Sequence, residues 1–156
     1  MTDSEMSLSC RNCREADSPF LAQLYALVHA PEFSALGLPA EMLAKLLQQQ
    51  SFAQETGYRQ QFPNAERRIV EVHGAPVGRM VVDIRPERLH LVDIALMPAY
   101  HRRGIGGELL KRLIAEAAGR PIGLHVSTSN PARRLYEQVG FRSVSEQPPY
   151  LRMEYP

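Results

Sequence analysis

The stretch Pro98-Ala99-Tyr100-His101-Arg102-Arg103-Gly104-Ile105-Gly106-Gly107-Glu108-Leu109 decides the fold of this chain. Three of the four residues from Gly104 to Gly107 are glycines, and the apolar period that follows predicts a helix over about residues 105–118. Glycines at a helix start let the backbone approach a ligand closely, and the unpaired N–H groups and the helix dipole there favour an anion. Because Arg102 and Arg103 add positive charge, the stretch predicts a cradle for a phosphate or pyrophosphate group.

Two common phosphate-binding motifs do not fit these glycines. A dinucleotide-binding GxGxxG would need its third glycine where Leu109 stands, and a P-loop would need a Gly-Lys-Ser/Thr ending. An unrelated nucleotide-binding protein is therefore supported only by the glycines themselves.

The segments before the loop combine helix and strand patterns. The strand closest to it is expected at residues 89–97, where Pro98 stops it. Earlier in the chain, the patterns predict a strand at 8–13, a helix at 18–29, a turn at 31–39, a second helix with its apolar face at 42–47 and a Gln-rich extension over 48–61, and a hairpin of strands at 69–72 and 77–84.

The segments after the loop continue this alternation. Asn130 is expected to cap a helix that has Pro131 at its first position and ends at Gly140. Strands are expected at residues 122–126, 142–145 and 150–155. Since hairpins are combined with one strand-helix-strand crossover, we predict a single α/β domain over residues 1–156 with a mixed sheet.

The composition narrows the class of partner. The 156 residues carry 18 Lys+Arg against 17 Asp+Glu, a net charge of +1, and the arginines are scattered. Neither nucleic acid nor a membrane is therefore an expected partner. The N-terminus MTDSEMSLSCR has acids where an export signal needs a basic and then an apolar run, so a cytoplasmic protein is expected.

Cys10 and Cys13 form an isolated CxxC, the spacing of half a zinc site or of a redox pair. A structural zinc needs four ligands, and the histidines are isolated from one another in the sequence. We therefore expect two ordinary reduced thiols in the first strand and no metal.

Two blocks of sequence resemble the GNAT superfamily of N-acetyltransferases. The family signature is Gln or Arg, two residues, Gly, one residue, then Gly or Ala, and residues 101–106 match it except at His101. Residues 132–141, ARRLYEQVGF, look like the end of the family helix Asn-x-x-Ala-x-x-Leu-Tyr-x-x-x-Gly-Phe. The resemblance extends over about residues 67–155 and includes Arg11, whereas the remainder of the first 60 residues shares only a strand-helix-helix plan.

The resemblance implies a fold and a cofactor site. The fold is a mostly antiparallel central sheet with splayed strands, flanked by about four helices. The cosubstrate is acetyl-CoA: its pantetheine arm is expected to pair with the open strand before the loop, and its pyrophosphate to lie on the loop. Ser129 or Asn130 fills the place of a family asparagine that contacts the pantetheine arm. The strand and loop positions are Ile94, Ala95, Leu96, His101, Arg102, Arg103, Gly104, Ile105, Gly106 and Gly107.

Direct transfer of an acetyl group to an amine needs a neutral nucleophile, support for the oxyanion and a proton for the leaving thiolate. By resemblance, Tyr136 takes the general-acid position near the sulfur, or else is an ordinary core tyrosine. For the base we expect His125, Asp93 or a water relay, with His90 and Glu87 as weaker alternatives.

The function implied is N-acetylation of a primary amine on a small molecule, peptide or protein. The alternative on the same fold is a catalytically silent acyl-CoA-binding or sensing module. The acceptor is not readable from the sequence, and the chain is expected to be a monomer or a homodimer.

Overall fold

The fold is built around one seven-stranded sheet, seen in a computed structural model that describes residues 7–156. The strand order is β1-β2-β3-β4-β5-β7-β6. Residues 1–6 lie outside the described part, and the expectation about an export signal depends mainly on them. The strands are β1 (Leu8–Asn12), β2 (Glu66–Val72), β3 (Ala75–Ile84), β4 (Leu89–Leu96), β5 (Ile122–Ser127), β6 (Arg142–Gln147) and β7 (Tyr150–Tyr155).

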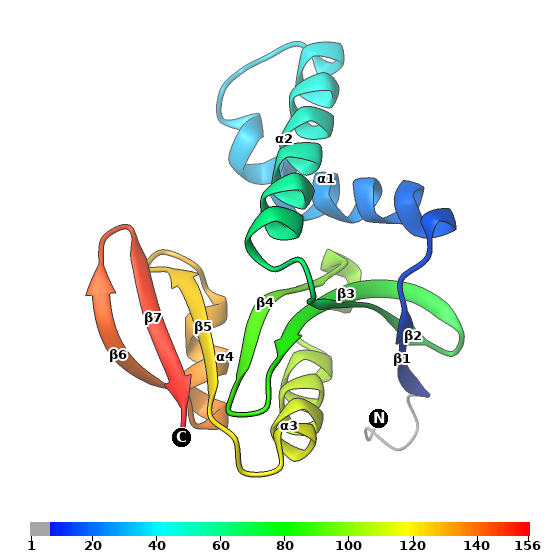
Figure 1. Ribbon diagram of the computed structural model, residues 1–156. Helices are drawn as coiled ribbons and strands as arrows, with labels where there is room; N and C mark the ends of the chain where they lie inside the picture. Colours follow the sequence, from blue (N-terminus) through cyan, green and yellow to red (C-terminus); the bar gives the residue numbers. More distant parts are fainter. Residues whose placement is uncertain (1–6) are drawn as a thin grey trace.

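The sheet changes direction once, at its centre. Strands β4 and β5 run parallel and share only three register pairs, from Leu89↔Ile122 to Leu91↔Leu124. The other neighbouring strands in the order are antiparallel. Beyond the last parallel pair the two strands diverge toward their carboxyl ends (Figure 1). The predicted mixed, mostly antiparallel sheet with splayed strands is confirmed.

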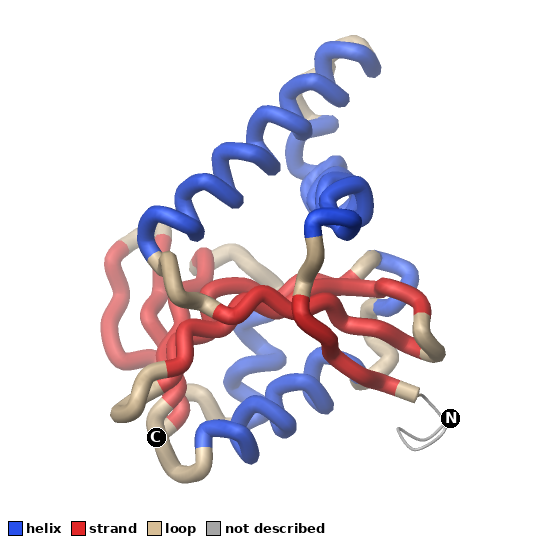
Figure 2. The backbone as a smooth tube through the Cα atoms, turned by 45° about the vertical axis from the view of Figure 1, so that its right-hand side comes forward, coloured by secondary structure: helices blue, strands red, loops and turns tan. Residues whose placement is uncertain are grey.

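Four α-helices cover the two faces of the sheet, as predicted. Figure 2 shows one pair on each side. The helices are α1 (Ser18–Ser34), α2 (Ala40–Gln61), α3 (Ile105–Ala117) and α4 (Ala132–Val139). None of the helices in the described part is long and apolar enough to cross a bilayer.

The core lies mainly on the α3 and α4 side. Helix α3 buries Ile105, Leu109, Leu110, Leu113 and Ala117, because its apolar residues recur at helical spacing. By contrast, α1 buries only Leu24 and α2 only Leu47. The α1–α2 layer is therefore held to the sheet with little help from apolar burial.

One expectation for the N-terminal third is wrong and another is confirmed. The turn predicted at 31–39 begins too early, because α1 continues through Pro31 to Ser34. Proline removes one helix hydrogen bond, to the carbonyl of Leu27, and Leu27 is solvent-exposed near the end of the helix, where water can replace that bond. The Gln-rich extension does continue the second helix, which runs unbroken to Gln61.

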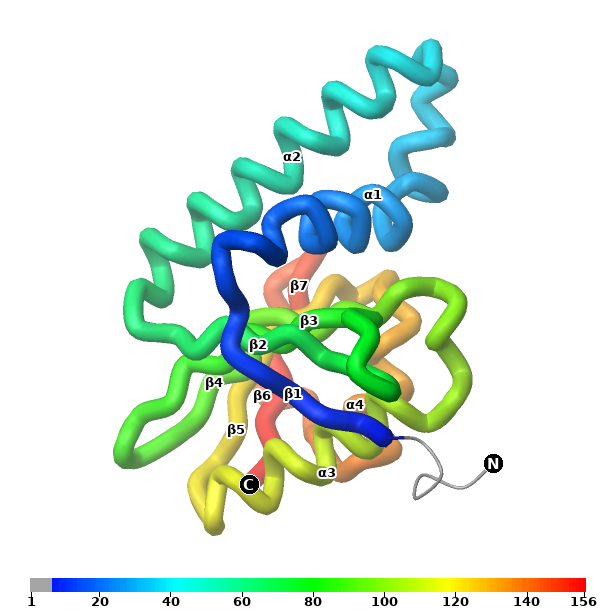
Figure 3. The backbone as a smooth tube through the Cα atoms, turned by 90° about the vertical axis from the view of Figure 1, so that its right-hand side faces the viewer, coloured from blue at the N-terminus to red at the C-terminus, as the bar shows by residue number. Residues whose placement is uncertain are grey.

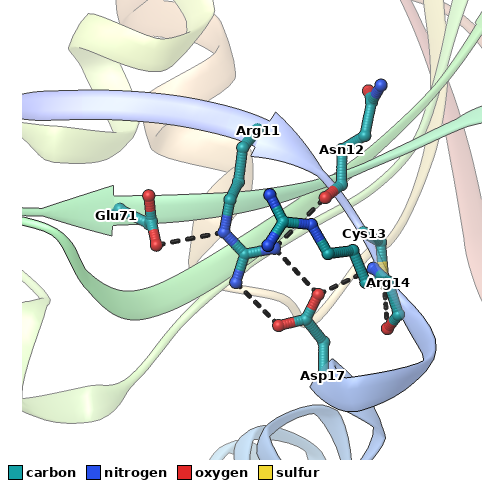
Figure 4. Close-up of polar contacts among 6 residues, drawn as sticks. All are labelled: Arg11, Asn12, Cys13, Arg14, Asp17 and Glu71. Atoms are coloured by element: carbon teal, nitrogen blue, oxygen red, sulfur yellow. Dashed lines mark hydrogen bonds and ion pairs between the residues drawn. The ribbon is translucent and has the colours of Figure 1, made fainter.

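A partly buried ion pair links β1 to the start of α1 at the sheet edge (Figure 3). The Arg11 guanidinium donates to both Asp17 oxygens, at 2.7 and 2.9 Å, and to Glu71 at 3.1 Å (Figure 4). The Arg14 backbone N–H donates to Asp17 as well, at 2.7 Å. The bonds from Arg11 and then from Arg14 lower the pKa of Asp17 to about 2.

Candidate functional site

The site is centred on the fork between β4 and β5. His125 directly follows the last parallel pair on β5, and Asp93 lies two residues beyond that pair on β4. Beyond Leu91, β4 pairs only with β3 on its other side. One edge of β4 is therefore open, which is the geometry that a main-chain ligand needs.

Hydrogen-bond alternation shows which backbone groups face the opening. The Met97 N–H donates to the Val77 carbonyl at 2.8 Å, and Leu96 pairs with Gly78 in the register. Because bonded and non-bonded pairs alternate along an antiparallel ladder, the N–H and C=O groups of Ile94 and Leu96 point away from β3. Those of Ala95 point toward Arg79 of β3. Ile94 and Leu96 thus supply the free polar groups of the open edge.

One of these groups has an internal partner. The Nε2 atom of His101 lies 2.8 Å from the Leu96 carbonyl oxygen, close enough for a hydrogen bond in which the ring N–H donates. His101 is itself exposed and begins the glycine loop. The loop is therefore tied to the end of the open edge.

The glycine loop forms the predicted helix start. Gly104 has φ +78°, a left-handed conformation that suits glycine, and α3 begins at the next residue. The first helical bond runs from Glu108 N–H to the Gly104 carbonyl at 3.1 Å. The N–H groups of Ile105, Gly106 and Gly107 precede that bond, so the helix itself leaves them without partners.

Gly106 and Gly107 differ in their surroundings. A Cβ on Gly106 would lie 2.8 Å from Cδ2 of Leu135, whereas a Cβ on Gly107 would lie at an ordinary 3.8 Å from Cδ1. Gly106 thus also allows α3 and α4 to pack closely, a structural role that the motif alone does not reveal.

A groove of about 590 Å³ continues from the loop between α3 and α4. The exposed Lys111 contributes a positive charge to its wall and Glu108 a negative one. It is lined by Gly104, Gly107, Glu108, Lys111, Ile114, Leu135, Gln138, Val139 and Tyr155.

Tyr136 lies on α4, 7% exposed, with its ring 5.8 Å from that of Phe141 in the main core. Burial, and then the charge of Asp93, raise the pKa of its hydroxyl. Asp93 therefore lies within electrostatic reach of Tyr136, although the two come from different elements.

Ser129 and Asn130 have local partners. The Asn130 side-chain oxygen accepts a hydrogen bond from Ala132 N–H at 2.9 Å, so it helps to cap the start of α4. Pro131, expected as the first helical residue, instead precedes the helix, which begins at Ala132. The Ser129 hydroxyl lies 3.1 Å from that of Ser127.

The two candidate bases have different environments. His125 is exposed, and its ring centroid lies 5.4 Å from that of His90, which stacks on Phe62 at 5.1 Å. Asp93 instead accepts a hydrogen bond from Arg79 Nε at 2.9 Å. Its carboxylate is thus engaged by a cation, while the His125 ring is open to solvent.

Comparison with known proteins agrees with this geometry. Residues 40–141 match the model of the Acetyltransferase (GNAT) family. The chain belongs to the GNAT family. The chain is also similar to N-alpha-acetyltransferase RimI of Mycobacterium tuberculosis, with 43% identity over 69 residues, 44% of each protein. Cysteine-rich protein 2-binding protein of Mus musculus is 35% identical over 66 residues, 42% of this chain.

The chain spans less than half the length of these curated relatives: the match covers 44% of RimI and 8% of the mouse protein. A solved GNAT structure covers much more of the chain. The PaiA N-acetyltransferase of Thermoplasma acidophilum, in complex with coenzyme A, has a TM-score of 0.70 and 16% identity over 96% of this chain and 98% of that one. At this identity the comparison establishes the fold.

The GNAT motifs did not indicate the polar network around Arg79. This side chain is 6% exposed and bonds to Gln54 at 2.9 Å, to Glu55 and to Asp93, while Tyr58 lies under its guanidinium. Glu55 also pairs with Arg67. A lone arginine inside the apolar run 77–84 was the one signal in the sequence, because a buried charge needs partners.

Proposed function

We propose that this GNAT protein is an acetyl-CoA-dependent N-acetyltransferase, formed as one domain over residues 1–156. The observation that carries the proposal is the fork. The open edge of β4 leads from the glycine loop at one end to Asp93 and His125 at the other.

The residues along this path fit acetyl-CoA. The N–H groups of Ile105, Gly106 and Gly107 suit the pyrophosphate, with Arg102 and Arg103 adding charge from the exposed side. The main-chain groups of Ile94 and the Leu96 N–H are offered to the pantetheine amides, whereas the main chain of Ala95 pairs with β3, so that only its methyl group can line the arm. His101 joins the glycine loop to the end of β4 through its hydrogen bond to Leu96, and the α3–α4 groove beside Lys111 suits the nucleotide part of acetyl-CoA.

The cosubstrate supplies an acetyl group activated as a thioester. We assign His125 as the base that removes the amine proton, directly or through water, because its ring is exposed at the fork. We assign Tyr136 as the acid that returns a proton to the leaving sulfur. At neutral pH the hydroxyl carries the proton that this role needs, as an ordinary tyrosine does. Asp93, bonded to Arg79, is the second candidate base.

Ser129 and Asn130 are proposed to border the pantetheine arm at the start of α4. The hydrogen bond that Asn130 makes as a cap uses only its side-chain oxygen, so its NH₂ group can still donate to a ligand.

We propose a primary amine as the acceptor, on a small molecule or a peptide. The similarity to a protein named N-alpha-acetyltransferase supports an amine acceptor, and the nearly balanced charge supports a cytoplasmic enzyme without a nucleic-acid or membrane partner. Either a monomer or a homodimer is compatible with this function.

Two measurements on the purified protein test the proposal. Calorimetry should detect acetyl-CoA binding, and a free-thiol assay should detect coenzyme A release when a panel of primary amines is added. Absence of binding would refute the proposal. Binding without thiol release for every amine would instead favour an acyl-CoA-binding module.

A further inference from the structure

A group of arginines lies on the α1–α2 face of the sheet, beside His125. Ile122, Leu124 and Val126 of β5 are buried in the main core, so His125 between them points to the opposite face. Arg152 of β7 is its register partner, and residues directly opposite on neighbouring strands share a face. Arg152 therefore stands next to the proposed base.

Arg88 reaches the same place from the loop before β4. A Cβ on Gly123 would lie 2.5 Å from Arg88 Nη2 and 3.6 Å from His90 Nδ1. The absence of a side chain at Gly123 thus gives the Arg88 guanidinium room beside β5. We call Arg88, Arg142, Arg152 and Glu154 the arginine cluster, since Arg142 of β6 is the register partner of Glu154.

The three arginines of the arginine cluster are accompanied there by a single carboxylate, that of Glu154. Both Arg88 and Arg152 contact the same oxygen of Glu154, at 3.5 and 3.3 Å. Charge-assisted bonds are normally about 2.7–2.9 Å long, so both contacts are weak. Arg68, by comparison, has two carboxylate partners, each at 2.6 Å.

The arginine cluster also affects the pKa of a neighbouring histidine, His90. His90 lies between the arginine cluster and Phe62. Its pKa is lowered to about 4, first by burial and then by the nearby His125 and Arg88, with Arg152 acting in the same direction and Asp83 opposing them. The arginines at this place thus act on His90 in addition to burial, on the face where we propose that the acceptor amine lies.

We propose that the arginine cluster binds an acidic group of the acceptor, so that the preferred substrate carries a carboxylate close to its primary amine. This inference rests on the proposed N-acetyltransferase function. With the acceptor amine at His125, its acidic group would meet Arg152 and Arg88. The amine and the acid would then be separated by about one or two residues of a peptide, or by a comparable distance in a small amino acid.

Matched acceptors test this inference. Peptides that differ only at the second residue, Glu, Gln or Lys, are compared by kcat/KM in the thiol assay. A small-molecule arm compares β-alanine with its amide. The Glu peptide should be favoured about tenfold over the Gln peptide, the effect of one charge-assisted contact. A preference confined to β-alanine would identify a small-molecule acceptor.

The variants Arg152→Gln and Arg88→Gln should each lower the Glu/Gln ratio toward 1, because each removes one of the two arginines that meet the acid. Arg133→Gln removes the same charge from exposed α4 and should keep the ratio. Using two separate variants keeps the test valid if one of them folds poorly. Equal use of the Glu and Gln peptides together with equal use of β-alanine and its amide would overturn the inference, as would a preference that survives both variants.

Direct binding separates this inference from the proposed function. Fluorescence anisotropy of the labelled Glu and Gln peptides, with coenzyme A present, measures recognition without turnover. A Glu preference that weakens with salt and is reduced in Arg152→Gln supports the inference. It does so even if no peptide is acetylated, a result that would refute only the proposed N-acetyltransferase activity. Equal binding of the two peptides, combined with no preference for β-alanine over its amide in the thiol assay, would overturn the inference.

Discussion

At the scale of single residues, Tyr136 has both a structural and a chemical environment. Its ring packs on Phe141, while its hydroxyl is close enough to Asp93 for the charge to raise its pKa. Tyr136→Phe keeps the ring and removes only the proton. We expect kcat to fall by about 10²-fold, as for loss of a general acid. The thiol assay gives kcat and calorimetry gives the acetyl-CoA affinity, which should stay unchanged; a weaker affinity would point to a structural role.

His125 is tested through the pH dependence of the rate. A base must be neutral to accept a proton, so activity should fall on the acidic side of the kcat/KM profile. His125→Ala should lower kcat/KM about tenfold or more and shift or abolish this limb. The profile is measured with two acceptor amines of different basicity. A limb caused by the enzyme stays at the same pH with both amines, whereas a limb caused by ionisation of the acceptor moves with its basicity.

His90 provides the control for this experiment. Its pKa of about 4 keeps it neutral above about pH 5, so it cannot produce a limb near neutrality. His90→Phe, which preserves the stack on Phe62, should leave the position of the limb unchanged. An acidic limb that persists in His125→Ala would transfer the role to Asp93 or to water.

At the scale of elements, Asp17 anchors α1 to β1. Its folded-state pKa of about 2 lies below the ordinary value of 3.8, so the ion pair stabilises the fold above about pH 4 and loses its effect as the pH falls toward 2. Asp17→Asn should lower Tm at pH 7 by about 3–6 °C, from a loss of about 1–2 kcal/mol. Thermal unfolding from pH 7 to 2 should show the difference from wild type narrowing; a constant difference would contradict the ionic origin.

The start of α3 separates a packing glycine from a ligand-binding one. Gly106→Val has no room beside Leu135 and should reduce the free energy of unfolding by about 1–3 kcal/mol. Gly107→Val has more space and lies on the α3–α4 groove. It should weaken acetyl-CoA binding about tenfold or more, a loss comparable to one or two charge-assisted contacts, at nearly unchanged Tm. Calorimetry with a melting curve checks both, and wild-type affinity in Gly107→Val would refute the cradle.

At the scale of the whole molecule, α2 is held to the sheet mainly by polar contacts. Glu55 joins α2 to Arg79 and Arg67, whereas Leu47 is the one buried residue of the helix. Glu55→Gln should reduce the unfolding free energy by about 2 kcal/mol, because Arg79 loses an ionic partner in a buried site. Hydrogen exchange should accelerate more in α2 than in α3. Exposed Glu41, on the same helix, gives the control Glu41→Gln, and equal effects of the two variants would exclude this anchoring role.

Local sequence was sufficient to predict most of the elements and the glycine start of α3. Helix α3 and its glycine start, the cap at Asn130 and the strands around the loop depend on side-chain period and backbone freedom over a few residues. These properties act within one segment, so a single sequence can reveal them. The boundaries of α1 could not be read in this way, because a proline is tolerated or rejected according to whether water can replace the lost bond.

Only the tertiary structure decided how the candidate site is assembled. The fork requires β4 and β5 to separate after three pairs, and the Arg79 network joins residues that lie 14 to 25 positions apart in the chain. The arginine cluster likewise gathers Arg88, Arg142 and Arg152 from different segments through strand register. Such contacts depend on how whole elements pack, and no local propensity encodes that. The sequence by itself determined most of the elements and the glycine start of α3, whereas packing determined which charges gather beside His125.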